Sequence, residues 1–328
     1  MIAGLGSIGR RHLRNLRALG ESDILLYRTH LSTLPDEELD GLPISTDLEA
    51  ALAWQPDAAI ISNPTAAHLS TALPAARVGC HLLLEKPISH TLEGTDDLIR
   101  IMQTHGKQAL VGFQFRFHPV LMQVKALLNS GELGRPLSVH AHWGEYLPGW
   151  HPWEDYRNGY AARSDLGGGV VLTLCHPFDY LRWLIGDVTA LSATIANTSD
   201  LDLGVEDQAE VTLNFANGCL GTVHLDYYQR PASHWFEIVT TDGIIRWDNS
   251  DGAAEIILAE RGMREHLVPP AGFERNHLYL AEMKHFLALV HGNETAPRCT
   301  LEDGKQALII ALGVYESAAK NSSQIKVR

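Results

Sequence analysis

Cysteine and basic charge are both scarce in this chain of 328 residues. The four cysteines stand far apart and form no C-x-x-C pair, so neither a disulfide framework nor a cysteine-bound metal is expected. Lys and Arg number 26 against 39 Asp and Glu, which gives a formal net charge of −13. This balance argues against nucleic acid or an anionic membrane as the main partner. Any anionic ligand must therefore be held locally, by helix ends or single cations.

Long apolar runs are missing as well, since no stretch reaches membrane-spanning length. Together with the sparse cysteines, this makes the reducing cytoplasm the expected location. The length allows two domains with cores of their own. The chain begins inside its first expected strand, and strands usually have about five or six residues. We therefore expect a few residues to precede Met1 in the natural protein.

The first dozen residues contain the strongest local pattern. Gly4, Gly6 and Gly9 stand at G-x-G-x-x-G spacing between an apolar strand end and a helical pattern. The first glycine allows a tight turn, the second lets the backbone at Ser7 and Ile8 approach a pyrophosphate, and the third lets helix and strand pack closely. The helix N-terminus then offers N–H groups to phosphate. The pattern predicts a dinucleotide-binding turn, with a plain strand–helix turn as the alternative.

Residues 1–112 alternate apolar strands with helical patterns. Further strands are expected at 23–27, 57–62, 81–84 and 108–112, with helices at 46–52, 67–78 and 91–105. This alternation predicts a doubly wound parallel sheet, in which ligands bind outside the carboxyl ends of the strands. The candidate cofactor-binding residues beyond the glycine turn are those at these strand ends: Arg28, Thr29, Asn63, Pro64, His68, Glu85, Lys86 and Gln114.

After residue 119 the pattern changes. Alternating segments at 137–143, 191–197, 207–215, 219–227, 235–240 and 243–247 predict strands, and two helices are expected at 278–291 and 302–320. The pairs Asn217-Gly218 and Asp242-Gly243 favour hairpins between them. We expect an α/β chain of two domains: a Rossmann domain at 1–117, and at 118–328 an α+β domain with an antiparallel sheet.

The sequence Glu85-Lys86-Pro87 follows an expected strand end, and Pro87 gives Lys86 an extended or turned path. A lysine placed there could hydrogen-bond a nicotinamide ribose or a substrate hydroxyl. It could also transfer a proton if its pKa were lowered. The alternative is an ordinary surface pair of Glu and Lys.

A run of three glycines at 167–169 precedes an apolar helical stretch at 170–184. The glycines permit close approach of backbone or ligand. His176, Asp179 and Tyr180 share one face of this expected helix. A histidine with an acid one turn further on could be an oriented general acid or base, and the alternative is a core histidine.

An aromatic, histidine-rich loop is expected over residues 140–157. The spacing of His140, His142 and His151 does not fix them as ligands, so we predict no metal site. Aromatic rings interspersed with polar groups suit the faces and hydroxyls of a sugar. The alternative is an ordered loop that covers the sheet.

Several of these motifs occur together in one known family. The matching pieces are Gly4–Gly9 with His12, Asn63-Pro64-Thr65 with His68, Glu85-Lys86-Pro87, residues 112–117, and the glycine run followed by His176 and Asp179. In this order and spacing, the chain resembles the Gfo/Idh/MocA oxidoreductases (glucose–fructose oxidoreductase, inositol dehydrogenase, rhizopine catabolism) along essentially its whole length.

The resemblance implies a Rossmann domain followed by a domain with a large open sheet that is often used for oligomer contacts, hence a homodimer or homotetramer. It implies NAD or NADP as cofactor and hydride transfer to or from a sugar, sugar derivative or cyclitol. By the same resemblance Lys86 and His176 are the catalytic candidates, and Arg116 helps to shape the substrate site. A non-catalytic NAD(P)-binding sensor and an NAD-assisted glycosidase are the alternatives on this fold.

The chain departs from the family pattern at one position near His176. The family commonly has an aspartate four residues before this histidine, where this chain has Leu172. We expect the missing acid to be absent or supplied by Asp179, Tyr156 or Tyr160, which are the further substrate-binding candidates. Residues 176–184 also resemble a subgroup found with nonulosonate or surface-polysaccharide pathways.

The second departure lies at the end of the second strand. NAD-specific Rossmann sites usually carry an acid there for the ribose 2′-hydroxyl, whereas arginine suits a 2′-phosphate. Here the sequence is Tyr27-Arg28-Thr29-His30, without an acid. The sequence therefore predicts a preference for NADP over NAD.

Overall fold

The protein is described from a computed structural model that covers residues 1–29, 34–259 and 262–327, so His30 lies outside the described residues. The chain divides into two compact units. The first contains Met1–Gln114 and Glu274–Lys305, and the second Phe115–Phe273 and Gln306–Arg328. The sequence placed everything after residue 117 in one domain, whereas residues 274–305 belong to the first unit. Local patterns cannot show such a return of the chain.

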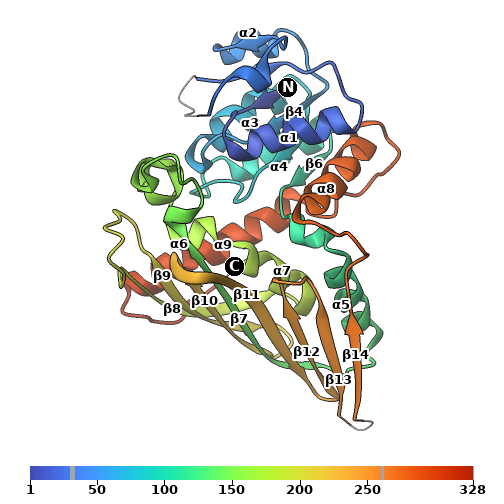
Figure 1. Ribbon diagram of the computed structural model, residues 1–328, viewed down its shortest axis with the longest axis vertical. Helices are drawn as coiled ribbons and strands as arrows, with labels where there is room; N and C mark the ends of the chain where they lie inside the picture. Colours follow the sequence, from blue (N-terminus) through green and yellow to red (C-terminus); the bar gives the residue numbers. More distant parts are fainter. Residues whose placement is uncertain (30–33, 260–261, 328) are drawn as a thin grey trace. The chain divides into compact units, whose positions relative to one another are not determined.

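The sheet of the first unit has six parallel strands in the order β3-β2-β1-β4-β5-β6 (Figure 1). The strands are β1 (Ile2–Ala3), β2 (Leu26–Tyr27), β3 (Ile44–Ser45), β4 (Ala58–Ile61), β5 (His81–Leu84) and β6 (Ala109–Val111). This confirms the predicted doubly wound sheet. Strand order reverses between β1 and β4, which is where such sheets bind ligands. The sequence missed β3, because two residues with Ile44 exposed give no apolar pattern.

The α-helices of the first unit are α1 (Ser7–Ala18), α2 (Leu48–Leu52), α3 (His68–Arg77), α4 (Thr95–His105) and α8 (Arg275–Val290); short 3-10 turns are η1 (Glu37–Leu39) and η2 (Thr65–Ala67). Helix α1 packs on α8, and α3 packs on α4. Asp47 caps α2 by accepting a hydrogen bond from the Ala50 N–H at 2.9 Å. Helix α4 begins four residues later than the sequence predicts, because Gly94 (φ +78°) precedes it in the left-handed region.

The second unit contains a nine-stranded sheet in the order β14-β13-β12-β11-β7-β10-β9-β8-β15. The strands are β7 (Pro136–Tyr146), β8 (Val188–Ala196), β9 (Gln208–Phe215), β10 (Leu220–Asp226), β11 (Tyr228–Thr240), β12 (Gly243–Asp248), β13 (Ala254–Leu258), β14 (Met263–Leu267) and β15 (Ile325–Lys326). Between the described strands of this nine-stranded sheet, only β7 and β10 pair in parallel. The mostly antiparallel sheet is thus confirmed. Strands β13, β14 and β15 were missed.

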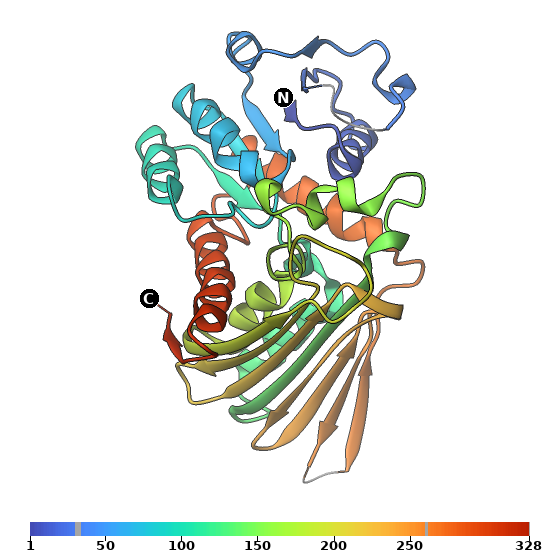
Figure 2. The ribbon, with the colours of Figure 1, turned by 90° about the vertical axis from the view of Figure 1, so that its left-hand side faces the viewer.

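The α-helices of the second unit are α5 (Pro119–Ser130), α6 (Val170–Thr173), α7 (His176–Ile185) and α9 (Leu301–Ala319). The first residues of α9, up to Lys305, belong to the first unit. The 3-10 turns of the second unit are η3 (Gln114–Phe117), η4 (Leu147–Gly149), η5 (Tyr156–Asn158), η6 (Tyr160–Ala162) and η7 (Ser164–Leu166). Figure 2 shows α5, α7 and α9 on one face of the sheet, while no described helix covers the other. Alternate strand residues are accordingly buried and exposed. None of the helices in the described ranges is long and apolar enough to cross a bilayer.

Two expectations for this unit were wrong. The helix predicted at 170–184 is two helices, because Pro177 has no N–H to donate to the Thr173 carbonyl, and proline suits the first turn of a new helix, α7. The loop predicted at 140–157 begins only after Tyr146, because β7 continues that far between two neighbouring strands.

Candidate active site

The glycine turn after β1 combines close packing with one open position. Gly4 has φ +90°, and a Cβ there would lie 2.4 Å from the Asn63 nitrogen. A Cβ at Gly9 would lie 1.9 Å from the Gly4 carbonyl oxygen. At Gly6, by contrast, a Cβ would meet no described heavy atom within 4 Å. Gly4 and Gly9 are thus required by the fold, and Gly6 leaves room for a ligand.

Helix α1 begins directly at this open position. Gly6 is its N-cap, no described side chain caps it, and its first turn, which contains Ser7 and Ile8, has no acidic residue. A helix N-terminus without a capping side chain or an acid presents its N–H groups to an anion. The residues present therefore fit the pyrophosphate of a dinucleotide.

The loop after β4 lies against the glycine turn. Asn63 donates through Nδ2 to the Ala67 carbonyl (3.1 Å) and the Thr71 hydroxyl (2.9 Å). Its Oδ1 is buried and accepts no hydrogen bond from the described residues, so it can accept one from a ligand. Pro64 begins the short turn that leads to α3.

His68 joins this loop to the loop after β5. One ring nitrogen lies 2.9 Å from the Asn63 carbonyl oxygen and the other 2.8 Å from the Pro87 carbonyl oxygen. The side chain is buried, and both nitrogens face backbone oxygens. These contacts join the two loops, and the cofactor contact that the sequence predicts for His68 stays a prediction.

Glu85 holds the next loop in place. The His12 Nε2 lies 2.7 Å from Glu85 Oε1, and the Lys86 N–H donates to Glu85 Oε2 at 3.2 Å. Burial disfavours the ionised carboxyl, but the hydrogen bond from His12 and the charges of His12 and Lys86 outweigh it and hold the pKa of Glu85 below its usual value. Glu85 therefore orients the backbone at Lys86, which follows the carboxyl end of β5.

The sequence analysis missed Glu282 on α8. Its side chain is fully buried, and neither carboxylate oxygen has a hydrogen-bond partner among the described residues. Burial, and next the charge of Glu85, raise the pKa of Glu282 well above its usual value. Burial thus favours the neutral form of this carboxyl. The sequence did contain a sign that Glu282 is buried. Leu278 and Phe286 stand one helical turn before and after it, which places Glu282 on the apolar face of the helix.

At the end of β2, Arg28 is buried and donates through Nη1 to Asp36 Oδ1 at 2.7 Å. This hydrogen bond holds the pKa of Asp36 below its usual value. Thr29 next to it is exposed. An acid absent from the residues directly after the second strand thus lies beside Arg28 in space, eight residues further along the chain.

His176 stands at the start of α7 in the second unit and is 3% exposed. Its ring packs edge-on against Phe115 (centroids 5.1 Å apart) and stacks on Trp143 (5.2 Å). Leu172, at the position of the family aspartate, is buried on α6. These rings fix the orientation of the imidazole.

Asp179 forms a buried ion pair with Arg116. The Arg116 Nη2 lies 2.7 Å from Asp179 Oδ1, its Nε lies 3.0 Å from Oδ2, and the two side chains are 4% and 2% exposed. Both residues were predicted to bind substrate. The structure brings them together as a bidentate pair that ties η3 to the first turn of α7, one turn beyond His176.

Two of the remaining candidates, Tyr156 and Tyr160, lie in the polypeptide before the glycine run. The Tyr156 hydroxyl donates to the Leu201 carbonyl at 2.8 Å. A Cβ at Gly168 would lie 2.2 Å from the Tyr160 carbonyl oxygen, so this glycine serves close approach of backbone rather than of ligand. Gln114, the last cofactor-binding candidate, is the final residue of the first segment of the first unit, and it is buried.

The strand order of the six-stranded sheet, the open position at Gly6 and the loops joined through His68 are those of a dinucleotide-binding Rossmann domain. A family profile described as "Oxidoreductase family, NAD-binding Rossmann fold" matches residues 1–113, and the "GFO/IDH/MocA C-terminal domain" matches residues 121–246. The chain belongs to the Gfo/Idh/MocA family of oxidoreductases, and the resemblance in its motifs is confirmed.

Its relatives include the myo-inositol 2-dehydrogenase of Thermotoga maritima, which is 26% identical over 98% of this chain and 96% of that protein. The D-xylose 1-dehydrogenase (NADP(+)) 2 of Haloferax volcanii is 28% identical over 80% of this chain and 78% of that protein. Among solved structures, a levoglucosan dehydrogenase in complex with NADH and levoglucosan superposes with a TM-score of 0.86. That match covers 99% of this chain and 98% of the other, at 21% identity, and it supports the fold.

Proposed function

We propose that this oxidoreductase transfers a hydride between a nicotinamide and a carbinol or carbonyl carbon of a sugar, sugar derivative or cyclitol. The observation that carries the proposal is the open position at Gly6, at the uncapped N-terminus of α1, in a chain of this family. The named relatives act on inositol and xylose, which supports the substrate class. The bound nicotinamide supplies the hydride acceptor or donor.

In this proposal Lys86 and His176 hold and move the proton of the reacting oxygen. During alcohol oxidation one of them, in its neutral form, accepts the hydroxyl proton as the hydride leaves carbon. During reduction the protonated group returns it. Glu85 orients Lys86 through the hydrogen bond to its backbone, and the rings around His176 orient the imidazole. The assignment rests on the family resemblance of these two residues.

The first test is nucleotide binding by Gly6→Val. Because a Cβ at Gly6 meets no described atom, the variant should fold normally, while its side chain fills the space proposed for the pyrophosphate. We expect NADP(H) and NAD(H) to bind about tenfold more weakly or worse, a loss of about 1.4 kcal/mol. Mass spectrometry of the purified protein for bound nucleotide, then titration of both proteins by fluorescence, measures this.

A screen of polyols, aldoses, cyclitols and nucleotide-linked sugars, followed by the absorbance of reduced nicotinamide, tests the reaction itself. The nucleotide-linked sugars are included because residues 176–184 resemble a surface-polysaccharide subgroup. Substrate-dependent nucleotide reduction supports the proposal. Tight nucleotide binding without turnover favours a sensor, and glycoside cleavage without net nucleotide change favours an NAD-assisted glycosidase. If the wild-type protein binds neither NAD(H) nor NADP(H), the proposed hydride transfer is overturned.

For the cofactor, we propose a preference for NADP(H) through Arg28, supported by its position directly after β2. Arg28→Asp should shift the ratio of kcat/KM values for NADP and NAD about tenfold or more toward NAD, because a carboxylate repels the 2′-phosphate. Arg14→Asp is the control, since Arg14 is exposed and pairs with Glu38 on the surface. An unchanged ratio in Arg28→Asp would rule out this role.

We also propose that the chain acts as a homodimer or homotetramer through the face of the nine-stranded sheet that no described helix covers (Figure 2). Support comes from the family resemblance and from this face itself. Sedimentation velocity gives the assembly directly.

A further inference from the structure

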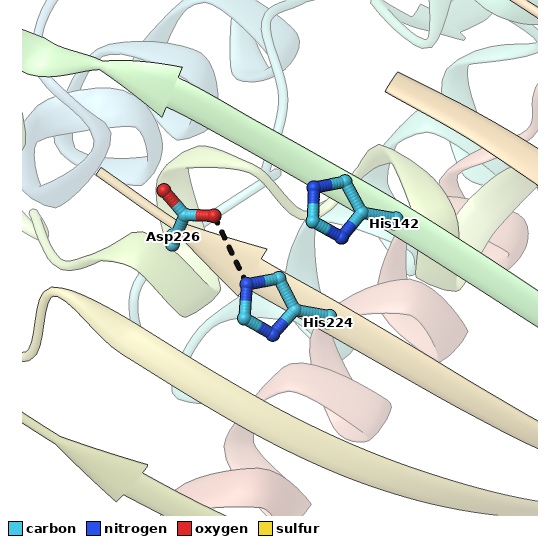
Figure 3. A group of neighbouring side chains, drawn as sticks. All are labelled: His142, His224 and Asp226. Atoms are coloured by element: carbon cyan, nitrogen blue, oxygen red, sulfur yellow. Dashed lines mark hydrogen bonds and ion pairs between the residues drawn. The ribbon is translucent and has the colours of Figure 1, made fainter. Parts of the chain in front are cut away.

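A cluster of two histidines and an aspartate lies on the face of the nine-stranded sheet that no described helix covers (Figure 3). His142 on β7 stands directly beside His224 on the parallel strand β10, and in the same register Gly144 stands beside Asp226. One ligand atom from each of the three side chains lies within 4.8 Å of the others. The proposed hydride transfer uses none of them.

The polar atoms of this cluster converge where Gly144 has no side chain. A Cβ at Gly144 would lie 2.1 Å from Gln229 Oε1 and 2.4 Å from Asp226 Oδ2. His142 Nε2 lies 2.6 Å from the same Gln229 oxygen, and His224 Nε2 lies 2.9 Å from the same Asp226 oxygen. Two imidazole nitrogens, one carboxylate oxygen and one amide oxygen therefore meet at one small gap.

A second layer of contacts orients these groups. Asp226 Oδ1 accepts hydrogen bonds from the backbone N–H groups of Tyr228 (3.0 Å) and Gln229 (2.8 Å), which leaves Oδ2 facing the cluster. Asp226 is 1% exposed, whereas His142, His224 and Gln229 beside it are half-buried. His224 Nδ1 lies 2.5 Å from Glu210 Oε1. Metal-binding histidines commonly have one ring nitrogen on the metal and the other hydrogen-bonded to a carboxylate, which is the position of Glu210 relative to His224.

We propose that His142, His224, Asp226 and Gln229 bind a divalent transition metal of the zinc type. Two imidazoles with two oxygen ligands suit zinc, whose ligands lie at about 2.0–2.2 Å in a tetrahedral arrangement. Ligand atoms in such a site are about 3.3 Å apart, so the side chains must rotate and draw together around the ion. The ion replaces the Nε2 protons of both imidazoles and links β7, β10 and the start of β11.

The alternative to a metal site is a protonated His224 that holds the cluster together by hydrogen bonds. Without an ion, His224 can donate to Asp226 and Glu210 at once, and the hydrogen bond to Asp226 is the main reason that the pKa of His224 is raised. A purely structural imidazolium would need no metal. The two arrangements differ in their response to added zinc and cobalt.

The test uses the full chain after treatment with a chelator and desalting. Zinc titrated by calorimetry is expected to bind once per chain, and cobalt should show the absorption bands of a four-coordinate ion. His142→Ala should weaken zinc binding about 100-fold or more, and Glu210→Gln by about 10- to 100-fold, as expected for a ligand and for its outer carboxylate. Zinc should raise the Tm of wild type and leave that of His142→Ala unchanged.

The matched control is His140→Ala. His140 lies two residues earlier on the same strand and face, where it contacts the Thr222 hydroxyl at 2.8 Å, and it should leave zinc binding unchanged. Equal zinc binding by the two alanine variants, or wild-type protein that gives no four-coordinate cobalt spectrum, overturns the proposal. Circular dichroism shows whether each variant is folded. Nucleotide binding by His142→Ala should equal that of wild type, which separates this result from the proposed function.

Discussion

Replacing Lys86 by alanine is expected to lower kcat of the proposed hydride transfer by about 10²- to 10⁴-fold, the range of a lost general acid or base. Lys86 stands at the carboxyl end of β5, and Glu85 anchors its backbone. Removing the side chain beyond Cβ leaves that anchor intact. Nucleotide affinity should therefore change less than about tenfold.

Two further variants separate proton transfer from charge. Lys86→Arg keeps a positive charge but holds its proton too strongly to exchange it, so its kcat should stay close to that of Lys86→Ala. His176→Ala should also be impaired, and the double variant should lose less than the product of the two single losses if both residues act on one proton. Lys284→Ala, on the exposed side of α8, is the control. Activity of Lys86→Ala within about threefold of wild type would remove Lys86 from the mechanism.

The second large effect concerns the buried pair of Arg116 and Asp179. Arg116→Met should destabilise the protein by about 3–5 kcal/mol, because it leaves the Asp179 carboxylate buried without its partner. The double variant Arg116→Met/Asp179→Leu should be more stable than the single one, since no unpaired charge remains. Unfolding in urea, followed by circular dichroism, gives both values.

The exposed pair of Arg157 and Asp155 provides the control, because its charges stay in water and Arg157→Met should have little effect. If Arg116→Met is as stable as wild type, the pair does not hold η3 and α7 together. The double variant also tests the predicted substrate roles. A folded protein that binds nucleotide but has lost turnover indicates that Arg116 or Asp179 acts on substrate as well as on its partner.

Part of the candidate site was predictable because it is encoded by residues close together in sequence. The turn from Gly4 to Gly9 was found from its glycine spacing between an expected strand and helix, and Glu85-Lys86-Pro87 from its position after an expected strand. Their meeting at one sheet edge followed from the rule that parallel strands end on the same side. The contacts of His68 with the Asn63 and Pro87 carbonyls agree with that meeting.

Other parts depend on partners far away in the sequence. Asp179 was considered as an acid for His176, yet its carboxylate pairs with Arg116, 63 residues earlier. The residues directly after β2 contain no acid, as the sequence analysis states, but the fold brings Asp36 into hydrogen-bond contact with Arg28. No local pattern reveals such pairs, because a charged side chain selects whatever opposite charge the fold brings near.

The sequence by itself determined the family, the doubly wound parallel sheet and the glycine turn, since period, turn chemistry and motif spacing are properties of neighbouring residues. Only the tertiary structure decided that residues 274–305 join the first unit and that Glu282 is buried beside the charge of Glu85. It also decided that His142 meets His224 and Asp226, which are more than 80 residues away. The physical reason is strand register: a shift of one residue between β7 and β10 would send these side chains to opposite faces of the sheet.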